Sequence, residues 1–405
     1  MKKLFLNTGW QVAGKAVGVV SALVATTFLV RLLPTKTYGN YIFLTTAVLL
    51  FLNLSDLGVG FFSVRQAARS AKPSRVYSQA FLLKFILTSL AWIAFCILVA
   101  LLPQFQEIRF VAVLASLGLF FFNLKTSAEI VFRTRLEFNK KVVLEALGSL
   151  FFVGAVIWAY QQRQTNLAWI IVFWLTAAAF SGLMSFWLVL KQADWRTFPS
   201  FRALKKLFFQ SLPLGARQTI FAVYDQGVDN FFLKTFSGSL QVGWYGLAYK
   251  IYASLTILAA FFMNSLFPAL SRQNRKQTRK SFQTAFGFLF LSGLILSVVL
   301  YFSAAFVVNL IAGPRFFLST VILKILSAAL FFSYLNHATG YTIIALGGQK
   351  RLLYLSLAAL AVNLIGNFIF IPRWGGVGAA WVTLATEVVM FVLSGGEVAK
   401  QFAKR

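Results

Sequence analysis

The sequence predicts an all-α integral membrane protein of about twelve transmembrane helices. The chain is 59% hydrophobic and only 12% charged, and its mean hydropathy is +0.77. Its Lys and Arg residues stand in short groups between apolar stretches of about 20 residues, the length that a helix needs to cross a bilayer. Soluble domains average about a quarter charged residues. This chain therefore has too little polar surface to cover a water-soluble core.

The apolar stretches predict two sets of six spans. The first set covers residues 9–30, 40–62, 78–102, 109–131, 142–160 and 166–190. The second set covers residues 211–235, 242–270, 281–303, 316–345, 352–371 and 376–397. Residues 304–317 fit either a span or a loop, so the end of the ninth span stays open.

A polar stretch at 191–210, with five basic residues and Pro199, separates the two sets. It predicts an N-terminal lobe at 1–195, a cytoplasmic linker at 196–210 and a C-terminal lobe at 211–405. The sequence Gly-Asn-Tyr at 39–41 also has an echo in Gly-Trp-Tyr at 243–245. The echo is explained either by a parallel duplication, as in many transporters, or by chance.

The basic residues predict the orientation of the spans, because Lys and Arg near helix ends remain on the cytoplasmic side. Alternate loops and tails hold 25 of the 38 Lys and Arg residues, whereas the intervening loops hold only seven. The rich set includes both ends of the chain. We therefore expect a multi-pass membrane protein with both termini in the cytoplasm.

Several function classes do not fit the sequence. The basic residues of the chain, whose net charge is +28, are spread over many loops rather than gathered on one soluble domain, which disfavours nucleic-acid binding. The only cysteine is Cys96, so an intrachain disulfide framework is excluded, and with it a cysteine-rich metal site. The outer loops are too short for the active site of a membrane glycosyltransferase, and no nucleotide-binding loop is present. We expect no enzymatic activity and no cofactor.

Three stretches resemble a known transporter family. They are RLLPTKTYGNY at 31–41 followed by LSDLG at 54–58, the region 212–271, and AVNLIGNFIFIPRWGGVGAAWVTLATE at 361–387. Together they are similar to the Wzx-type polysaccharide and O-antigen flippases of the MATE-like MOP superfamily. The resemblance implies a V-shaped pair of six-helix lobes around a central cavity. It also implies an undecaprenyl-pyrophosphate-linked oligosaccharide as the substrate, membrane lipid as the surroundings and a polysaccharide polymerase complex as a partner.

Basic residues inside the predicted spans are candidates for substrate binding, since charge in hydrocarbon usually faces a cavity or a partner. We expect Lys15 and Arg217 to face one cavity from the two lobes, with Lys250 as a third cavity cation that binds the pyrophosphate. Lys84, Lys125 and Lys324 are weaker candidates for the same role. The alternative for most of them is snorkelling to the cytoplasmic surface, and Lys125 also has Glu129 one turn away as an ion-pair partner.

Acidic residues inside the spans are rarer. Asp225 and Asp229 lie one turn apart in the seventh span, so one of them could bind H⁺ or Na⁺ and couple transport to an ion gradient. The alternative is a salt bridge to Arg217 or Lys250 that only fixes helix packing. The position of Asp56 near the end of the second span favours a structural role at a helix end. Glu387 is a further candidate for a residue that lines the cavity.

The sequence therefore favours a secondary transporter that flips lipid-linked oligosaccharide to the periplasmic leaflet. A multidrug or cation antiporter of the same superfamily, or a flippase for another lipid-linked precursor, is the alternative. An antiporter would favour a cavity dominated by acids, whereas this sequence places cations and acids together.

Overall fold

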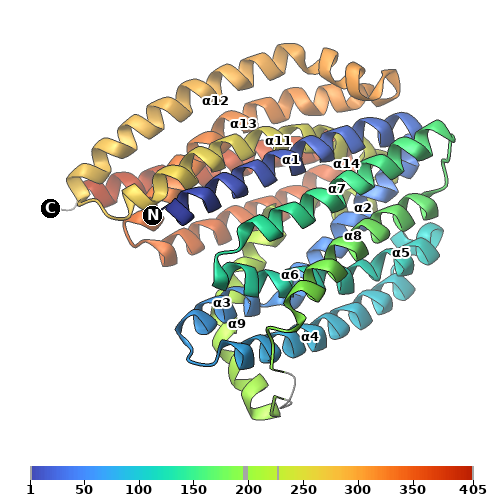
Figure 1. The fold of residues 1–405 in the computed structure, drawn as a ribbon. Helices are drawn as coiled ribbons and strands as arrows, with labels where there is room; N and C mark the ends of the chain where they lie inside the picture. The colour runs from blue at the N-terminus through green and yellow to red at the C-terminus, as the bar shows by residue number, and fades with distance from the viewer. Residues whose placement is uncertain (1, 195–198, 226–227, 404–405) are drawn as a thin grey trace. The chain divides into compact units, whose positions relative to one another are not determined.

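The computed structural model describes residues 2–194, 199–225 and 228–403, and these residues form helices joined by short connections (Figure 1). In the described ranges, ten helices are long and apolar enough to cross a membrane. One of the ten, α14 (Gln349–Ala403), contains two helical arms, because Gly375 leaves the helical conformation with φ 53° and ψ −132°. The described part of the predicted seventh span, 211–235, is helical and belongs to α9 (Phe201–Asp225) and α10 (Val228–Phe236). The predicted all-α fold of about twelve spans is confirmed.

The described chain divides into two compact units. Unit 1 comprises Met1–Pro34 and Phe43–Gly227, and unit 2 comprises Thr35–Ile42 and Val228–Arg405. This division differs from the predicted one in two places. Residues 211–227 group with unit 1 rather than with the C-terminal half, and the first eight residues of α2 (Thr35–Asp56) group with unit 2.

Unit 1 holds the helices of the N-terminal half. Besides most of α2 it contains α1 (Lys2–Leu32), α3 (Val59–Arg69), α4 (Pro73–Leu101), α5 (Arg109–Ser116), α6 (Gly118–Arg135), α7 (Phe138–Gln161), α8 (Leu167–Leu190) and α9. A 3₁₀ turn at Pro103–Ile108 joins α4 to α5. The predicted second span, 40–62, is in fact interrupted, since Leu57 and Gly58 take left-handed conformations with φ 40° and 78°. This break allows close backbone contact, because a Cβ on Gly58 would lie 2.4 Å from the amide nitrogen of Gly215 in α9.

The predicted linker is partly helical. Residues 201–210 form the first turns of α9, and their apolar face packs into the core of unit 1 through Leu204 and Leu207. The opposite face carries the exposed side chains of Arg202, Lys205 and Lys206. An amphipathic segment of this kind is typical of a helix that lies at the membrane surface before it enters the bilayer.

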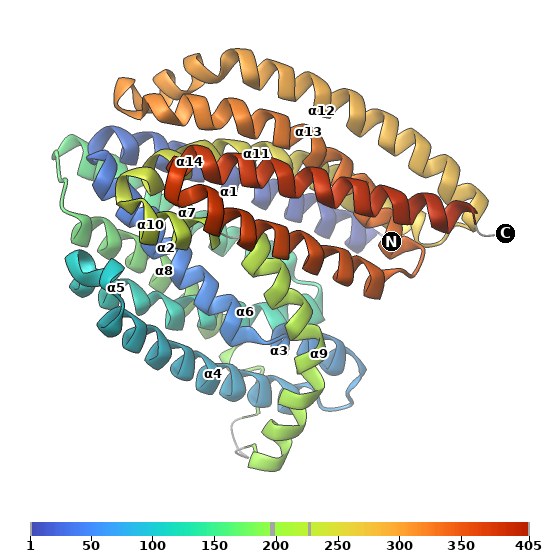
Figure 2. The same cartoon turned by 180° about the vertical axis from the view of Figure 1, so that it is seen from behind.

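Unit 2 is built around α11 (Gly238–Leu270), α12 (Arg275–Ala312), α13 (Phe317–Ala345) and α14, with α10 packed on α11 and α14. The region left open in the sequence is resolved here: α12 continues to Ala312, and Gly313, with φ 74°, ends it. The two arms of α14 run side by side (Figure 2). They pack so closely that a Cβ on Gly366 would lie 2.9 Å from the side chain of Val382.

Candidate functional site

The beginning of α2 is held in unit 2 by a glycine contact and a buried polar cluster. A Cβ on Gly39 would lie 1.8 Å from the carbonyl oxygen of Ser239, and one on Gly243 would lie 2.5 Å from the carbonyl oxygen of Thr35. Next to this crossing, the Lys234 ammonium donates to Asn40 Oδ1 at 2.9 Å and to the Ser239 hydroxyl. The two echoed sequences therefore pack on each other. Lys234 is one of the seven basic residues that the charge pattern predicts for the outer loops, but it is only 9% exposed.

Asp229 lies on α10 at one end of a line of polar side chains inside unit 2. The Tyr245 hydroxyl donates to Asp229 Oδ2 at 2.5 Å, and Asn367 Nδ2 donates to Asp229 Oδ1 at 2.6 Å. Tyr245 is also 3.1 Å from the Thr383 hydroxyl, and Asn367 donates to Asn363 Oδ1 at 3.0 Å. Among the described side chains, no basic group lies within salt-bridge distance of Asp229, which is 9% exposed.

The line continues along α11 to Glu387. The rings of Tyr245 and Tyr249 stack with centroids 5.6 Å apart, and the ring of Tyr249 is 5.5 Å from that of Tyr252. The Tyr252 hydroxyl donates to Glu387 Oε1 at 3.2 Å, and Asn336 Nδ2 donates to Glu387 Oε2 at 2.6 Å. We call these residues the polar track: Asp229, Tyr245, Tyr249, Tyr252, Asn336, Asn363, Asn367, Thr383 and Glu387. It draws side chains from α10, α11, α13 and both arms of α14.

The polar track offers oxygen ligands at its Asp229 end. The carboxylate, the side-chain oxygens of Asn363 and Asn367 and the Thr383 hydroxyl are hard donors, which suit a proton or a small cation such as Na⁺ rather than a transition metal. Asn367 Oδ1 is buried and accepts no hydrogen bond from any described residue. The described residues contain no group of three or more His, Cys, Asp or Glu side chains that could hold a metal. The oxygen atoms at this end of the polar track are therefore suited to a proton or a monovalent cation.

The remaining acids and bases of the spans fall into two groups. In unit 1, Lys84 Nζ is 2.6 Å from Asp56 Oδ1 and donates to the Thr126 hydroxyl at 3.0 Å. Lys125 pairs at 2.9 Å with Glu145 and not with Glu129, its suggested partner. In this unit the two weaker cation candidates therefore both have acidic partners.

The other cation candidates lie elsewhere. Lys250 on α11 is half-buried, and among the described residues its ammonium makes no ion pair or hydrogen bond. Lys324 lies 5.3 Å from the ring centroid of Tyr301, a cation–π contact. Lys15 is exposed on α1. The side chains of Arg217 and Asp225 lie outside the described residues, but α9, and Arg217 with it, belongs to unit 1, as Lys15 does, and not to the other lobe.

The sequence indicated Asp229 and Glu387 but missed their neighbours. Tyr245, Thr383 and the two asparagines are uncharged and so do not stand out in a hydropathy profile. One signal was available, since Asn363 and Asn367 lie one helical turn apart in an apolar stretch and place two amides on one face.

Comparison with known proteins agrees with this architecture. A family model described as polysaccharide biosynthesis protein matches residues 4–274. No curated protein sequence matches the chain.

Three solved structures share the fold. An inward-facing multidrug resistance MATE family transporter has a TM-score of 0.75 at 15% identity, with 95% of each chain covered. The lipid II flippase MurJ, in an inward closed conformation, has a TM-score of 0.79 at 12% identity, covering 98% of this chain and 89% of that one. The eukaryotic MATE transporter AtDTX14 has a TM-score of 0.65 at 16% identity, covering 100% and 97%.

Proposed function

Because the chain belongs to the polysaccharide biosynthesis protein family, we propose that it is a secondary transporter that flips a lipid-linked oligosaccharide. The proposed substrate is a polyprenyl-pyrophosphate-linked repeat unit, as in O-antigen synthesis. It would move from the cytoplasmic to the periplasmic leaflet of a bacterial inner membrane and there meet a polysaccharide polymerase. The fold shared with the lipid II flippase and with MATE transporters supports transport by a two-unit scaffold.

The main support for this proposal is the position of Lys250 deep in α11. It lies twelve residues into α11, or about 18 Å from the start of the helix at 1.5 Å per residue. A cation at such depth is costly unless it meets water or an anion. Since no acid among the described residues neutralises Lys250, its ammonium is available to the phosphates of a substrate head group. Lys15 and Arg217 remain our proposed cations for the same head group.

Asp229 is our proposed coupling group. Its described partners are a phenol and an amide, which can remain in place whether the carboxyl is charged, protonated or bound to Na⁺. An aspartate in a salt bridge would instead lose its ion pair each time its carboxylate was protonated or bound Na⁺. Passage of one charge through a membrane potential supplies about 2.3 kcal/mol per 100 mV, enough to bias an otherwise reversible exchange more than tenfold.

Flipping can be tested with purified protein in proteoliposomes. A lipid-linked oligosaccharide with a fluorescent sugar is added to one leaflet, and its transfer is measured by access to a membrane-impermeant quencher. We expect Lys250→Ala to slow transfer about tenfold, the loss of one charge-assisted contact of about 1.4 kcal/mol, and Lys250→Arg to retain most of the rate. The matched control is Lys205→Ala, an exposed cation on α9. Equal rates for all three variants and the wild type would refute the role of Lys250.

A cation antiporter is the second candidate, because Asp229 is the kind of uncompensated acid that such a transporter needs. Efflux of an organic cation from the same proteoliposomes separates the two. Asp229-dependent efflux with no transfer of lipid-linked sugar would identify an antiporter. Accumulated lipid-linked intermediates in a deletion strain would identify a flippase.

The orientation is tested separately by reporter fusions. Fusions after Arg75, Lys141 and Arg279 should be cytoplasmic, and those near Arg163 and Lys234 periplasmic. Reversed signals after the sixth span would contradict the proposed placement of the C-terminus.

A further inference from the structure

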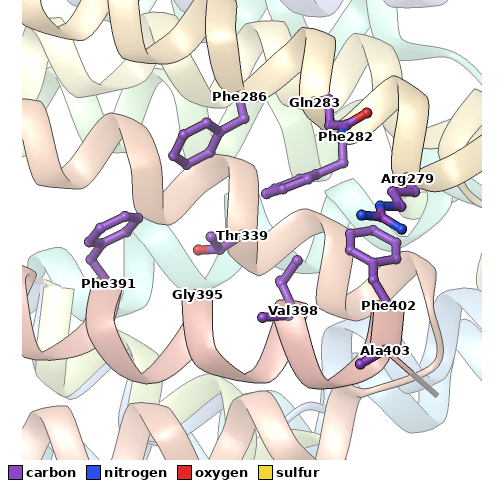
Figure 3. A pocket seen from close by; sticks show the side chains of 11 residues that line it. Arg279, Phe282, Gln283, Phe286, Thr339, Phe391, Gly395, Val398, Phe402 and Ala403 are labelled. Atoms are coloured by element: carbon purple, nitrogen blue, oxygen red, sulfur yellow. The ribbon is translucent and has the colours of Figure 1, made fainter.

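Unit 2 contains a cavity that is separate from the polar track. It has a volume of about 430 Å³ and lies between α12 and the second arm of α14, with Thr339 of α13 also in its lining (Figure 3). Helices α12 and α14 each pack extensively on α13, whereas neither packs extensively on the other. The cavity therefore occupies the gap between two helices that share a neighbour.

The walls of this cavity are aromatic. Phe282 and Phe286 come from α12, and Phe391 and Phe402 from α14. The centroids of Phe282 and Phe402 are 5.7 Å apart, and those of Phe286 and Phe391 are 6.3 Å apart. Between the two α14 rings stands Gly395, where an added Cβ would meet no atom within 4 Å. The absence of a side chain at this position leaves the cavity open.

One end of the cavity is basic. Arg279 lies at this end with Phe402 (Figure 3). The Arg279 side chain is exposed and makes no ion pair with a described residue. Arg275, one turn earlier, donates to the Gln401 carbonyl oxygen and so joins the start of α12 to the end of α14. Glu397, which is not part of the lining but precedes the lining residue Val398 on α14, is already bound by Arg351 at 2.7 Å. An anion at Arg279 would therefore meet positive charge with no competing carboxylate from Glu397.

The length of the cavity fits one leaflet of a bilayer. Phe391 and Phe402 are eleven residues apart on α14, or about 17 Å along a helix. Half of a hydrocarbon core is about 15 Å. A single acyl chain that reaches from the head groups to the bilayer midplane would have this length.

We propose that this cavity binds one anionic phospholipid of the leaflet that faces Arg279, with an acyl chain among the phenylalanines and the phosphate on the guanidinium. A planar guanidinium donates two parallel hydrogen bonds to phosphate. The bound chain fills the gap between α12 and α14 and stabilises unit 2. This inference does not depend on the proposed flipping activity, and its test contains no transport substrate.

Photocrosslinking can identify the occupant. The purified full-length protein is mixed with phosphatidylglycerol or phosphatidylcholine that carries the same diazirine-labelled oleoyl chain, and labelled peptides are identified by mass spectrometry. We expect phosphatidylglycerol to label the peptides that hold Phe282, Phe286 and Phe391 at least fivefold more than phosphatidylcholine does. Equal labelling by both lipids would show an ordinary apolar groove and overturn the proposal.

Two pairs of variants sharpen the test. Gly395→Leu should fill the cavity and abolish labelling, whereas Gly396→Leu, next to it and also at a position where an added Cβ meets no atom within 4 Å, should preserve labelling. Arg279→Ala should lower labelling by phosphatidylglycerol about tenfold and leave that by phosphatidylcholine unchanged, whereas Lys205→Ala on α9 should change neither. Loss of labelling in both leucine variants, or stronger competition by an unlabelled polyprenyl phosphate than by phosphatidylglycerol, would contradict the proposal.

The same variants have a readout in stability. A ligand that binds only the folded state raises the melting temperature, and more so as the ratio of free ligand to its Kd increases. Added phosphatidylglycerol should raise the melting temperature of the wild type and of Gly396→Leu but not that of Gly395→Leu. A leucine variant at position 395 that melts like the wild type without lipid confirms that the substitution itself is tolerated.

Discussion

Asp56 in unit 1 and Asp229 in unit 2 are both acids inside membrane helices, yet their surroundings differ. Asp56 faces the Lys84 ammonium at 2.6 Å, so its negative charge is matched by a fixed positive one. Asp229 receives hydrogen bonds from Tyr245 and Asn367, which stabilise a carboxylate without neutralising it. The ion pair of Asp56 favours the charged carboxylate alone. The neutral hydrogen-bond donors around Asp229 are compatible with a charged, a protonated or a cation-bound carboxyl group.

The same contrast extends to neighbouring residues of unit 1. Glu129 is bound by Arg133 and Lys141, and Glu145 by Lys125. The pairs Glu129–Lys141 and Glu145–Lys125 join α6 to α7, which indicates a structural role. The difference suggests a division of labour in which unit 1 uses its acids for packing and unit 2 keeps Asp229 for a change of state. Three substitutions test this interpretation, and a fourth, Gly39→Ala, tests the packing of unit 2.

The largest effect is expected for Lys84→Met. The Lys84 side chain is 3% exposed and that of Asp56 26%, so removing the lysine leaves a partly buried charge uncompensated, at a cost of up to about 3–5 kcal/mol. The apparent melting temperature of the purified protein should fall strongly. The double variant Asp56→Asn/Lys84→Met should recover much of the loss, and a double variant as unstable as the single one would contradict the structural role of the pair.

Gly39→Ala should have the next largest effect. The new methyl group would stand 1.8 Å from the Ser239 carbonyl oxygen, so α2 and α11 must separate at a cost of about 1–3 kcal/mol. The matched control is Gly18→Ala on α1 of unit 1, where nothing lies within 4 Å. The melting temperature should fall only for the first variant; an equal fall would show that the crossing in unit 2 is not specially tight.

Asp229→Asn should change stability little, by about 1 kcal/mol or less, because an amide oxygen still accepts the Tyr245 hydroxyl hydrogen bond. It should nevertheless remove the dependence of transport on a pH or Na⁺ gradient, measured in proteoliposomes. A loss of stability comparable to that of Lys84→Met would show that Asp229 is a packing residue. Flipping at one rate with and without any gradient, in wild type and variant alike, would refute coupling.

Lys140→Ala should have the smallest effect. Lys140 is paired with Glu137 at 2.8 Å, but its side chain is 48% exposed. Exposed pairs contribute about 0–1 kcal/mol, so the melting temperature should stay close to that of the wild type. A marked fall would mean that burial is not what distinguishes the Lys84 pair.

Much of the fold was predictable because each span is a local property of the sequence. About 20 apolar residues suffice to cross a bilayer, and the spans were found from that length alone. The breaks were harder to predict, since Leu57 carries no turn signal and Gly375 is one of 27 glycines. The division into units was not predictable either, because the contacts of α9 and of residues 35–42 join segments far apart in the chain.

The candidate site was predictable only where it is charged. Asp229 stands out because the whole chain has ten acids. Its partner Asn367 lies 138 residues away, and nothing in one sequence pairs the two. For Lys234 the charge itself was misleading. A lysine near a helix end is typical of an exposed loop, but a hydrogen bond to Asn40, 194 residues away, holds Lys234 in a buried cluster.

The placement of Thr35–Ile42 in unit 2 has a consequence for biogenesis. Asn40 is synthesised 199 residues before Ser239, the residue that donates a hydrogen bond to it. At a translation rate of about 5–20 residues per second, this interval lasts roughly 10–40 seconds. During that time α2 lies in the bilayer before α11 has been synthesised. The Asn40 side-chain amide and the backbone at Gly39 therefore do not yet have their contacts with α11. A chaperone or insertase that shields this face during translation would protect the nascent chain from premature pairing with other helices.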